Sequence, residues 1–222
     1  MKLTVSDQTF VPSTVSVLMA EALEVKEGDT VIDAGCGSGI LSIIAAKLGA
    51  HRVIGVDTAP DVVEVASANA ERHGVSEVTT FLHGDLFGPV EEDVRADVII
   101  GDVSGIPDEL AAVTGWFPGG VGGGPHGSEL PIRMLEAAKR LLAPGGKLFL
   151  PTGSLQDEGS ILSIAKDLYG KMTKIVEKNI PFPSQLAEAP EVLRLIRDKV
   201  ISLTPRGSRY VWTARVWEAA GS

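Results

Sequence analysis

A glycine-rich turn between a short apolar run and a helix-like segment is the feature that most constrains this chain. Residues 31–39 read VIDAGCGSG, in which Gly35, Gly37 and Gly39 alternate with other residues. Glycine adopts positive φ without steric cost and lets a ligand approach the backbone closely. The helix that begins after the glycines offers unpaired N–H groups at its N-terminus. The segment therefore predicts a strand, a tight turn and a helix that together bind a nucleotide-type ligand.

The spacing of these glycines separates the loop from two common phosphate-binding loops. The dinucleotide fingerprint G-x-G-x-x-G requires glycine at its sixth position, where Ile40 stands. A P-loop requires G-K-[ST], which the sequence lacks. Asp33 precedes the first glycine by two residues; it would repel a pyrophosphate, and it suits a cation such as the ammonium of an amino acid. The loop therefore disfavours a nicotinamide oxidoreductase.

Two further acids follow the next two predicted strands. Asp57 closes the run RVIGVD at 52–57, where a carboxylate accepts hydrogen bonds from both hydroxyls of a ribose. Asp85 follows the strand-like run 78–82 and is placed to accept from an adenine amino group. The alternative for each acid taken alone is that it caps a helix or turn. Together, a ribose, an adenine and a cationic amino acid describe S-adenosylmethionine.

Apolar runs that read as strands alternate with helix-like runs over residues 12–169. Runs such as VIDAG and VIGVD are largely continuous rather than alternating, which is typical of parallel strands covered on both faces. The β-α-β-α order predicts a doubly wound α/β sheet with right-handed crossovers. The expected strands are 30–35, 52–57, 78–82, 96–102 and 147–150, and the expected helices are 12–23, 40–48, 60–73, 129–142 and 156–169.

The pattern changes after Gly170. Segments 172–180 and 210–217 read as strands, and because no full crossover connects them we expect them to pair antiparallel at one edge of the sheet. Between them, residues 181–208 contain a helix-like run at 190–199 and are the candidate substrate-side insertion. No domain boundary is visible, so the 222 residues are predicted to form a single domain.

Residues 30–85 resemble the cofactor half of the Rossmann-like S-adenosylmethionine-dependent methyltransferases. VIDAGCGSGILSIIAAKLGA and the VIGVD that follows are very similar to the first two motifs of that superfamily, with the ribosomal-protein and release-factor glutamine methyltransferases nearest. The resemblance implies a mainly parallel seven-stranded Rossmann-like sheet with an antiparallel last strand, and S-adenosylmethionine as the cofactor. The implied cofactor-binding residues are Asp33, Gly35, Gly37, Gly39, Asp57 and Asp85.

The end of the fourth predicted strand is where the methyl acceptor should lie, because ligands of open α/β sheets bind beyond the C-terminal strand ends. The glutamine-methylating family has N-P-P-[FY] there, whereas this chain has DVSG at 102–105, so every motif position departs. Asp102 is a candidate catalytic residue that orients an ammonium, guanidinium or hydroxyl group or takes its proton. Ser104 is a candidate substrate contact. The alternative for both is turn formation.

A long glycine-rich segment, GWFPGGVGGGPHGSEL at 115–130, follows. A loop of this length inside a compact domain is usually functional or disordered. Trp116 and Phe117 are predicted to contact the substrate, with a packing role as the alternative for Trp116. His126 is a second candidate catalytic residue, because imidazole is a common general acid or base, or else it is a solvated loop residue.

Composition restricts the partners. The net charge of −9 and the pI of about 4.9 disfavour nucleic acid as a partner, although residues 194–215 are locally basic. A single cysteine, Cys36, excludes a disulfide scaffold and cysteine-rich metal sites, and no metal site is predicted. The absence of an apolar span predicts no membrane partner and a cytoplasmic location.

These observations predict an S-adenosylmethionine-dependent methyltransferase that transfers the methyl group in line to N or O of a small metabolite. A small metabolite is favoured because no separate recognition domain is visible and the N-P-P-[FY] motif is missing. One alternative is a protein side-chain methyltransferase, because the nearest resemblances act on translation proteins. The other is a catalytically silent, cofactor-binding partner subunit, because the acceptor motif is altered.

Overall fold

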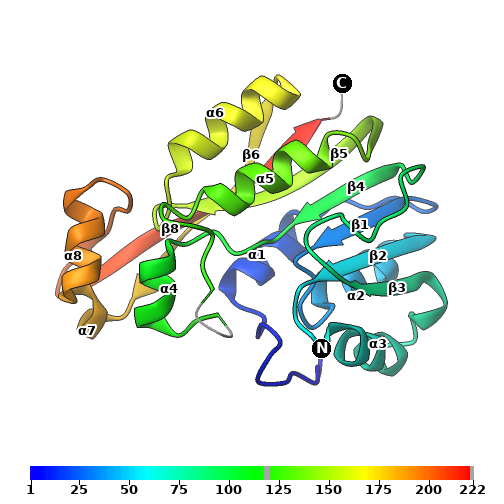
Figure 1. The fold of residues 1–222 in the computed structure, drawn as a ribbon, viewed down its shortest axis with the longest axis horizontal. Coiled ribbons are helices and arrows are strands. Elements are labelled where there is room, and N and C mark those ends of the chain that lie inside the picture. Colours follow the sequence, from blue (N-terminus) through cyan, green and yellow to red (C-terminus); the bar gives the residue numbers. More distant parts are fainter. Residues whose placement is uncertain (118–120, 221–222) are drawn as a thin grey trace.

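In the computed structural model, which describes residues 1–117 and 121–220, one mixed sheet is covered by helices on both faces (Figure 1). The strand order is β3-β2-β1-β4-β5-β8-β6, and β7 pairs with β8 beside this path. Strands β1 to β5 run parallel, and β8 pairs antiparallel with β5, β6 and β7. The strands are β1 Thr30–Ala34, β2 Arg52–Asp57, β3 Thr79–His83, β4 Ala96–Gly101, β5 Leu142–Gly153, β6 Met172–Phe182, β7 Thr204–Arg206 and β8 Arg209–Ala220.

The helices form two layers and one end cap. Helices α1, α2 and α3 pack against one face of the sheet, and α5 and α6 pack against the other. Helices α4, α7 and α8 gather at one end of the molecule, around the end of β6 (Figure 1). The bounds are α1 Thr14–Ala22, α2 Ile40–Leu48, α3 Val62–Arg72, α4 Asp108–Thr114, α5 Glu129–Ala138, α6 Glu158–Tyr169, α7 Ser184–Ala187 and α8 Pro190–Arg197, with a short 3₁₀ turn at Ser76–Val78.

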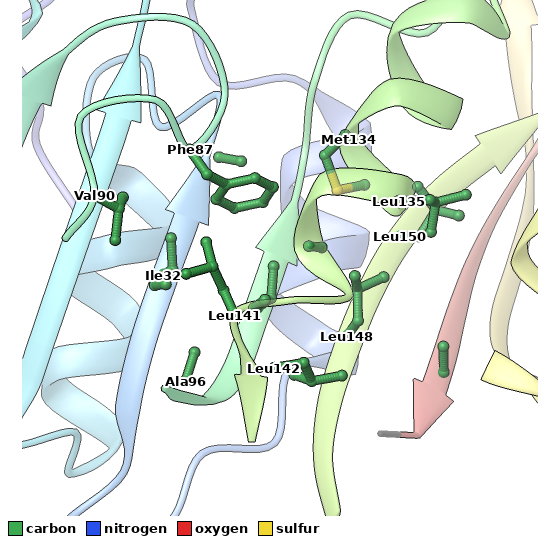
Figure 2. Close-up of a cluster of buried hydrophobic side chains, with 14 of the residues drawn as sticks. Ile32, Phe87, Val90, Ala96, Met134, Leu135, Leu141, Leu142, Leu148 and Leu150 are labelled. Atoms are coloured by element: carbon green, nitrogen blue, oxygen red, sulfur yellow. The ribbon is translucent and has the colours of Figure 1, made fainter. Parts of the chain in front are cut away.

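The apolar strands explain why the sheet is covered on both sides. Figure 2 shows one cluster, in which Ile32 and Leu148 of the sheet meet Met134 of α5. Phe87 and Val90, from the loop after β3, close the same cluster where the fold has no helix between β3 and β4. A second cluster packs α1 and α2 against the opposite face. Burial of this apolar surface supplies the main stabilisation of the sheet.

Strand order reverses at β1, which lies between β2 and β4. In an open α/β sheet, the ligand crevice lies beyond the carboxyl ends of the strands at such a reversal. The loops that follow β1, β2 and β4 meet there. The fold therefore places the glycine loop, Asp57 and Asp102 at one edge.

The structure confirms the predicted α/β class and the mainly parallel sheet with antiparallel pairing at one edge. It has eight strands rather than seven, because the short β7 pairs with the start of β8. Strand β5 begins at Leu142 rather than at 147, so the APGG that was expected to end a helix lies within the strand. The register of β5 against β4 shifts between Ala96 and Val98, which is an irregularity that glycines permit. Helix α4 was not predicted.

No helix in residues 1–117 and 121–220 is long and apolar enough to cross a membrane.

Candidate functional site

The glycine loop is a tight turn pressed between the ends of β2 and β4. The N–H groups of Gly35 and Cys36 both donate to the carbonyl of Val56, at 2.8 and 3.1 Å. Gly35 has φ of +80°, and a Cβ there would lie 2.5 Å from the backbone oxygen of Asp102. Gly39 precedes the first residue of α2 with φ of +80°. Only glycine at position 35 satisfies both the backbone conformation and the close approach.

Asp57 ends β2 with its carboxylate fixed against the glycine loop. Its Oδ2 accepts from the N–H of Gly37 and its Oδ1 accepts from the N–H of Ala59, both at 2.9 Å. An ionised carboxylate has about four acceptor positions, so two remain for a ligand. Asp57 also lines the cavity described below. It is therefore preorganised to accept hydrogen bonds from ligand hydroxyls.

Asp33 lies beneath the loop and is fully buried. Its Oδ2 accepts from the hydroxyl of Ser42 at 2.6 Å, and its Oδ1 has no partner among residues 1–117 and 121–220. Burial, aided by the nearby charges of Asp102 and Asp57 and opposed by the hydrogen bond from Ser42, raises the pKa of Asp33 to about 7. Asp33 is not among the described residues that line the cavity. Any effect of Asp33 on a ligand in the cavity would therefore come from its charge and not from direct contact.

Asp85 stands at the mouth of the crevice. Its carboxylate forms an ion pair with Arg133 of α5 at 2.6 Å, and both side chains are more than half exposed. The ion pair links the loop after β3 to the helix layer. Asp85 also lines the cavity, and its second oxygen is not used by Arg133.

A single cavity of about 730 Å³ runs from the glycine loop to the far end of the sheet. This volume is within the range of small-molecule sites. Three of the side chains that line it are carboxylates, and no Lys, Arg or His of the described part of the chain lines it. The lining near the loop includes Gly35, Asp57, Gly84 and Asp85, and the lining at the other end includes Ser104, Trp116, Phe117, Thr152, Gln156 and Trp212. The cavity therefore favours a cationic ligand and disfavours an anionic one.

Asp102 lies directly after β4 and lines the same cavity. Burial raises the pKa of Asp102 to about 6, and the hydroxyl of Ser16 in α1, at 3.5 Å, opposes this shift. The structure thus brings Asp102 together with the cofactor-side acids, and brings Ser104, Trp116 and Phe117 to the same cavity.

His126 does not lie with them. It lines a separate depression beside Asp157 and Arg194, and its Nδ1 lies 2.8 Å from Glu129 Oε1. Its side chain is 56% exposed. The predicted catalytic role of His126 therefore has no geometric support in this structure.

The sequence analysis did not predict the aromatic contacts of Phe117 and Trp116, nor part of the cavity lining at the end away from the glycine loop. Phe10, from the segment before α1, stacks on Phe117 with ring centres 5.1 Å apart. Trp116 packs edge-on against Phe182. The missed wall residues Gln156 and Trp212 come from the turn after β5 and from β8, and no local sequence pattern marks them.

Residues 122–127, here called the glycine strap, pack backbone to backbone against the turn after β4. Gly123 N–H donates to the Ile106 carbonyl at 2.7 Å, and Asp108 N–H donates to the Gly124 carbonyl at 3.0 Å. A Cβ on Gly123 would lie 2.5 Å from the backbone oxygen of Ser104. The strap therefore fixes the position of Ser104 in the cavity wall. Gly119 and Gly120, which belong to the same glycine-rich stretch, lie outside the described residues.

We expect Gly123→Ala to lower the melting temperature by roughly 4 to 8 °C, because the added methyl group forces the strap away from Ser104 at a cost of about 2 kcal/mol. Gly159→Ala is the control, since Gly159 does not have positive φ and a Cβ there meets only Asp157 Oδ1, at an ordinary contact distance of 3.6 Å. Calorimetric melting of both variants tests this. Equal melting temperatures for Gly123→Ala and the wild type would show that the strap does not hold this wall.

Half of the cations in the basic segment 194–215 are paired with acids. Arg194 pairs with Glu109, and Arg197 pairs with Asp198. Arg215 pairs with both Glu158 and Glu177. Three of the six cations of the segment are therefore engaged in ion pairs.

Comparison with known proteins agrees with this geometry. Residues 12–106 match the family model for ribosomal protein L11 methyltransferase. The curated ribosomal protein L11 methyltransferase of Photobacterium profundum is 46% identical over 124 residues, which are 54% of this chain and 32% of that protein. The chain thus spans about a third of the length of that relative.

Solved structures share the fold across nearly the whole chain. Precorrin 8W decarboxylase from Methanobacterium thermoautotrophicum has a TM-score of 0.63 and 17% identity, covering 98% of this chain and 96% of its own. The T. thermophilus 16S rRNA N2 G1207 methyltransferase, solved with AdoMet and guanosine, has a TM-score of 0.61 and 18% identity, covering 96% and 44%. Residues 12–106 thus resemble the ribosomal protein L11 methyltransferases, and the chain as a whole shares the fold of these solved structures.

Proposed function

We propose that this chain transfers the methyl group of S-adenosylmethionine to an amine nitrogen of a protein side chain. The observation that carries the proposal is the charge of the cavity: three carboxylates line it, and none of its described lining residues is a cation. Both the cofactor and an amine acceptor bring positive charge, which such a cavity stabilises. A phosphate or carboxylate substrate brings charge of the wrong sign.

The residues present fit the cofactor. The absence of a side chain at Gly35 leaves room for close approach, and Asp57 presents free acceptor positions to ribose hydroxyls. Asp33, Asp57 and Asp102 together favour an ammonium or sulfonium charge beside the loop. When bound, the cofactor supplies a methyl group already activated by the positive sulfur.

Asp102 is the residue we assign to the acceptor. Its carboxylate accepts hydrogen bonds from an ammonium group and takes up the proton that the nitrogen must lose before attack. Trp116, Phe117 and Trp212 line the same end of the cavity, and aromatic rings attract cations. The aromatic walls also exclude water and hold the nitrogen in line with the methyl group.

The choice of a protein acceptor is supported by the comparisons. The curated relatives matched at 35 to 46% identity are named for ribosomal protein L11, a protein substrate. This favours the protein side chain over the small metabolite predicted from the sequence. Because the chain spans only about a third of the curated relative from Photobacterium profundum, the specific substrate of those proteins is not carried over.

Tritiated S-adenosylmethionine, added with the protein to a lysate of the source organism, tests the proposal. We expect label in the protein fraction, recovered as methylated lysine after acid hydrolysis. Asp57→Ala should remove the label, whereas Asp93→Ala, an exposed acid outside the cavity, should not. Label in the small-molecule pool would instead identify a metabolite methyltransferase. Tight cofactor binding without label in any fraction would identify a silent partner subunit.

The buried acids predict a pH dependence of binding. Asp33 and Asp102 have pKa values raised to about 7 and about 6, so both lose protons as the pH rises through this range. The cavity then becomes more negative, and the sulfonium of S-adenosylmethionine gains affinity relative to neutral-sulfur S-adenosylhomocysteine. We expect the ratio of the two dissociation constants to change roughly tenfold between about pH 5.5 and about pH 8. Titration calorimetry with both ligands measures it.

The same acids predict the opposite trend for the stability of the unliganded protein. Each folded-state pKa lies above its unfolded value, so the unfolded chain releases these protons first and stability falls as the pH rises from about 4 to about 7. Asp33→Asn is the control, since it removes one of the two titrating groups and should weaken both trends, leaving the part due to Asp102. A ratio of dissociation constants that is independent of pH would contradict the proposed charge coupling.

A further inference from the structure

Gln156 is a polar residue of the cavity wall whose hydrogen bonds are not satisfied. It lies in the turn between β5 and α6, and it lines the acceptor end of the cavity. Its Nε2 is buried and has no hydrogen-bond partner among residues 1–117 and 121–220. A buried amide donor without a partner is destabilising, so its retention calls for an explanation.

The backbone around Gln156 holds the side chain in place. The carbonyl of Gln156 accepts from Glu158 N–H at 2.8 Å, and the next residue, Asp157, donates its N–H to the His126 carbonyl at 3.0 Å. The side-chain amide lies against Gly105, where a Cβ would be 3.1 Å from Gln156 Oε1. The amide is therefore held in a slot beside the turn that carries Ser104.

The neighbouring polar groups already have partners. Thr152 Oγ1 accepts from Trp217 Nε1 at 2.8 Å and donates to Glu158 at 2.5 Å. Glu158 is held in turn by Arg215. The hydroxyl of Ser104 donates to the Val121 carbonyl at 3.2 Å. Among the described residues at this end of the cavity, the buried side-chain donor without a hydrogen bond is thus the amide of Gln156.

An N–H donor binds an oxygen acceptor, and the cavity restricts which kind. Carboxylate and phosphate oxygens are disfavoured because Asp57, Asp85 and Asp102 line the same space. A neutral carbonyl oxygen remains. We propose that Gln156 is a specificity-determining residue that donates its side-chain amide to a neutral carbonyl of the methyl acceptor, as in a peptide bond near the target amine. This inference rests on the proposed amine acceptor and deepens it.

Nuclear magnetic resonance of the side-chain amides tests the inference directly. The chain has three glutamines and two asparagines, so five such groups appear, and loss of one in Gln156→Met assigns it. The probe is Nα-acetyl-lysine methylamide, added to protein saturated with S-adenosylhomocysteine. We expect the Gln156 resonances to shift on titration. Gln156→Met should weaken probe binding about tenfold, the loss of one hydrogen bond.

Two controls separate recognition from structure. Butylamine has the amine and no carbonyl, so it should bind the wild type and Gln156→Met equally. Gln185→Met changes an exposed glutamine of α7 that is not among the residues lining the cavity, and it should leave binding of the lysine probe unchanged. Gln156→Met should melt at or above the wild-type temperature, because it removes an unpaired buried donor.

The possible results test this inference and the proposed function separately. Equal binding of the lysine probe to the wild type and Gln156→Met, no binding to the wild type, or a lowered melting temperature for Gln156→Met would each overturn the inference. Carbonyl-dependent probe binding without methyl transfer to any protein would keep the inference and overturn the proposed function.

Discussion

Gly35→Ala should abolish cofactor binding and destabilise the fold. The new Cβ would lie 2.5 Å from the backbone oxygen of Asp102, on a residue with φ of +80°. Adoption of positive φ by alanine costs about 1 to 2 kcal/mol, and displacement of the β4 turn raises the total to about 3 kcal/mol or more. We expect the dissociation constant of S-adenosylhomocysteine to rise about a hundredfold or more, because the added methyl group pushes the glycine loop away from the turn that contains Asp102. Fluorescence of the cavity tryptophans and denaturant unfolding measure the two effects.

Gly28→Ala isolates the conformational part of this effect. Gly28 has φ of +89°, and a Cβ there would meet nothing within 4 Å. Its substitution should therefore cost about 1 to 2 kcal/mol and leave ligand binding unchanged. If Gly35→Ala and Gly28→Ala behave alike, the contact between the glycine loop and Asp102 has no energetic role.

Asp102→Asn should strongly slow methyl transfer and largely spare the binding of S-adenosylhomocysteine, whose sulfur is neutral. Asparagine keeps the shape of the side chain, but it neither carries the negative charge that holds an ammonium nor takes up its proton. Loss of a general base slows such reactions by about a hundredfold to ten-thousandfold, and we expect a loss in this range. Transfer of tritium to the protein fraction measures the rate, and calorimetry with S-adenosylhomocysteine measures binding, which should change by less than about threefold.

Asp97→Asn is the matched control, because Asp97 lies near the other end of β4. Its carboxylate accepts from the N–H of Thr30 at 2.9 Å, far from the cavity lining. Asp97→Asn should keep wild-type transfer. Undiminished transfer by Asp102→Asn would move the acceptor chemistry to another residue.

The cofactor half of the site was predictable because its signals are local. Residues 31–57 contain a strand, a glycine turn, a helix and a second strand in continuous sequence, and α2 and β2 have the bounds expected from that sequence. Asp57 faces the glycine loop because adjacent parallel strands end side by side. Asp33 was predicted to bind the cofactor. The spacing of the motif alone did not show that the side chain would be fully buried beneath the loop.

The acceptor half was only partly predictable, because its residues meet through tertiary packing. Phe10, Gln156 and Trp212 are far apart in sequence and share the cavity through the positions of β5 and β8. His126 shows the reverse: it is near Trp116 in sequence, yet the strap turns it outward. Strand β7 has three exposed residues and so carries no apolar pattern to reveal it.

The position of β8 has a consequence for the order of folding. Strand β8 follows β6 in the chain but lies between β5 and β6 in the sheet, and it also pairs with β7. The parallel strands β1 to β4 pair with strands from the same N-terminal part of the chain. Strand β6, in contrast, pairs in this sheet only with β8, so it cannot form its sheet hydrogen bonds until β8 is present. Long-range antiparallel pairing of this kind forms slowly. During synthesis, the cofactor half is therefore expected to assemble first, and the wall that carries Trp212 and supports Gln156 closes only once β8 has been made.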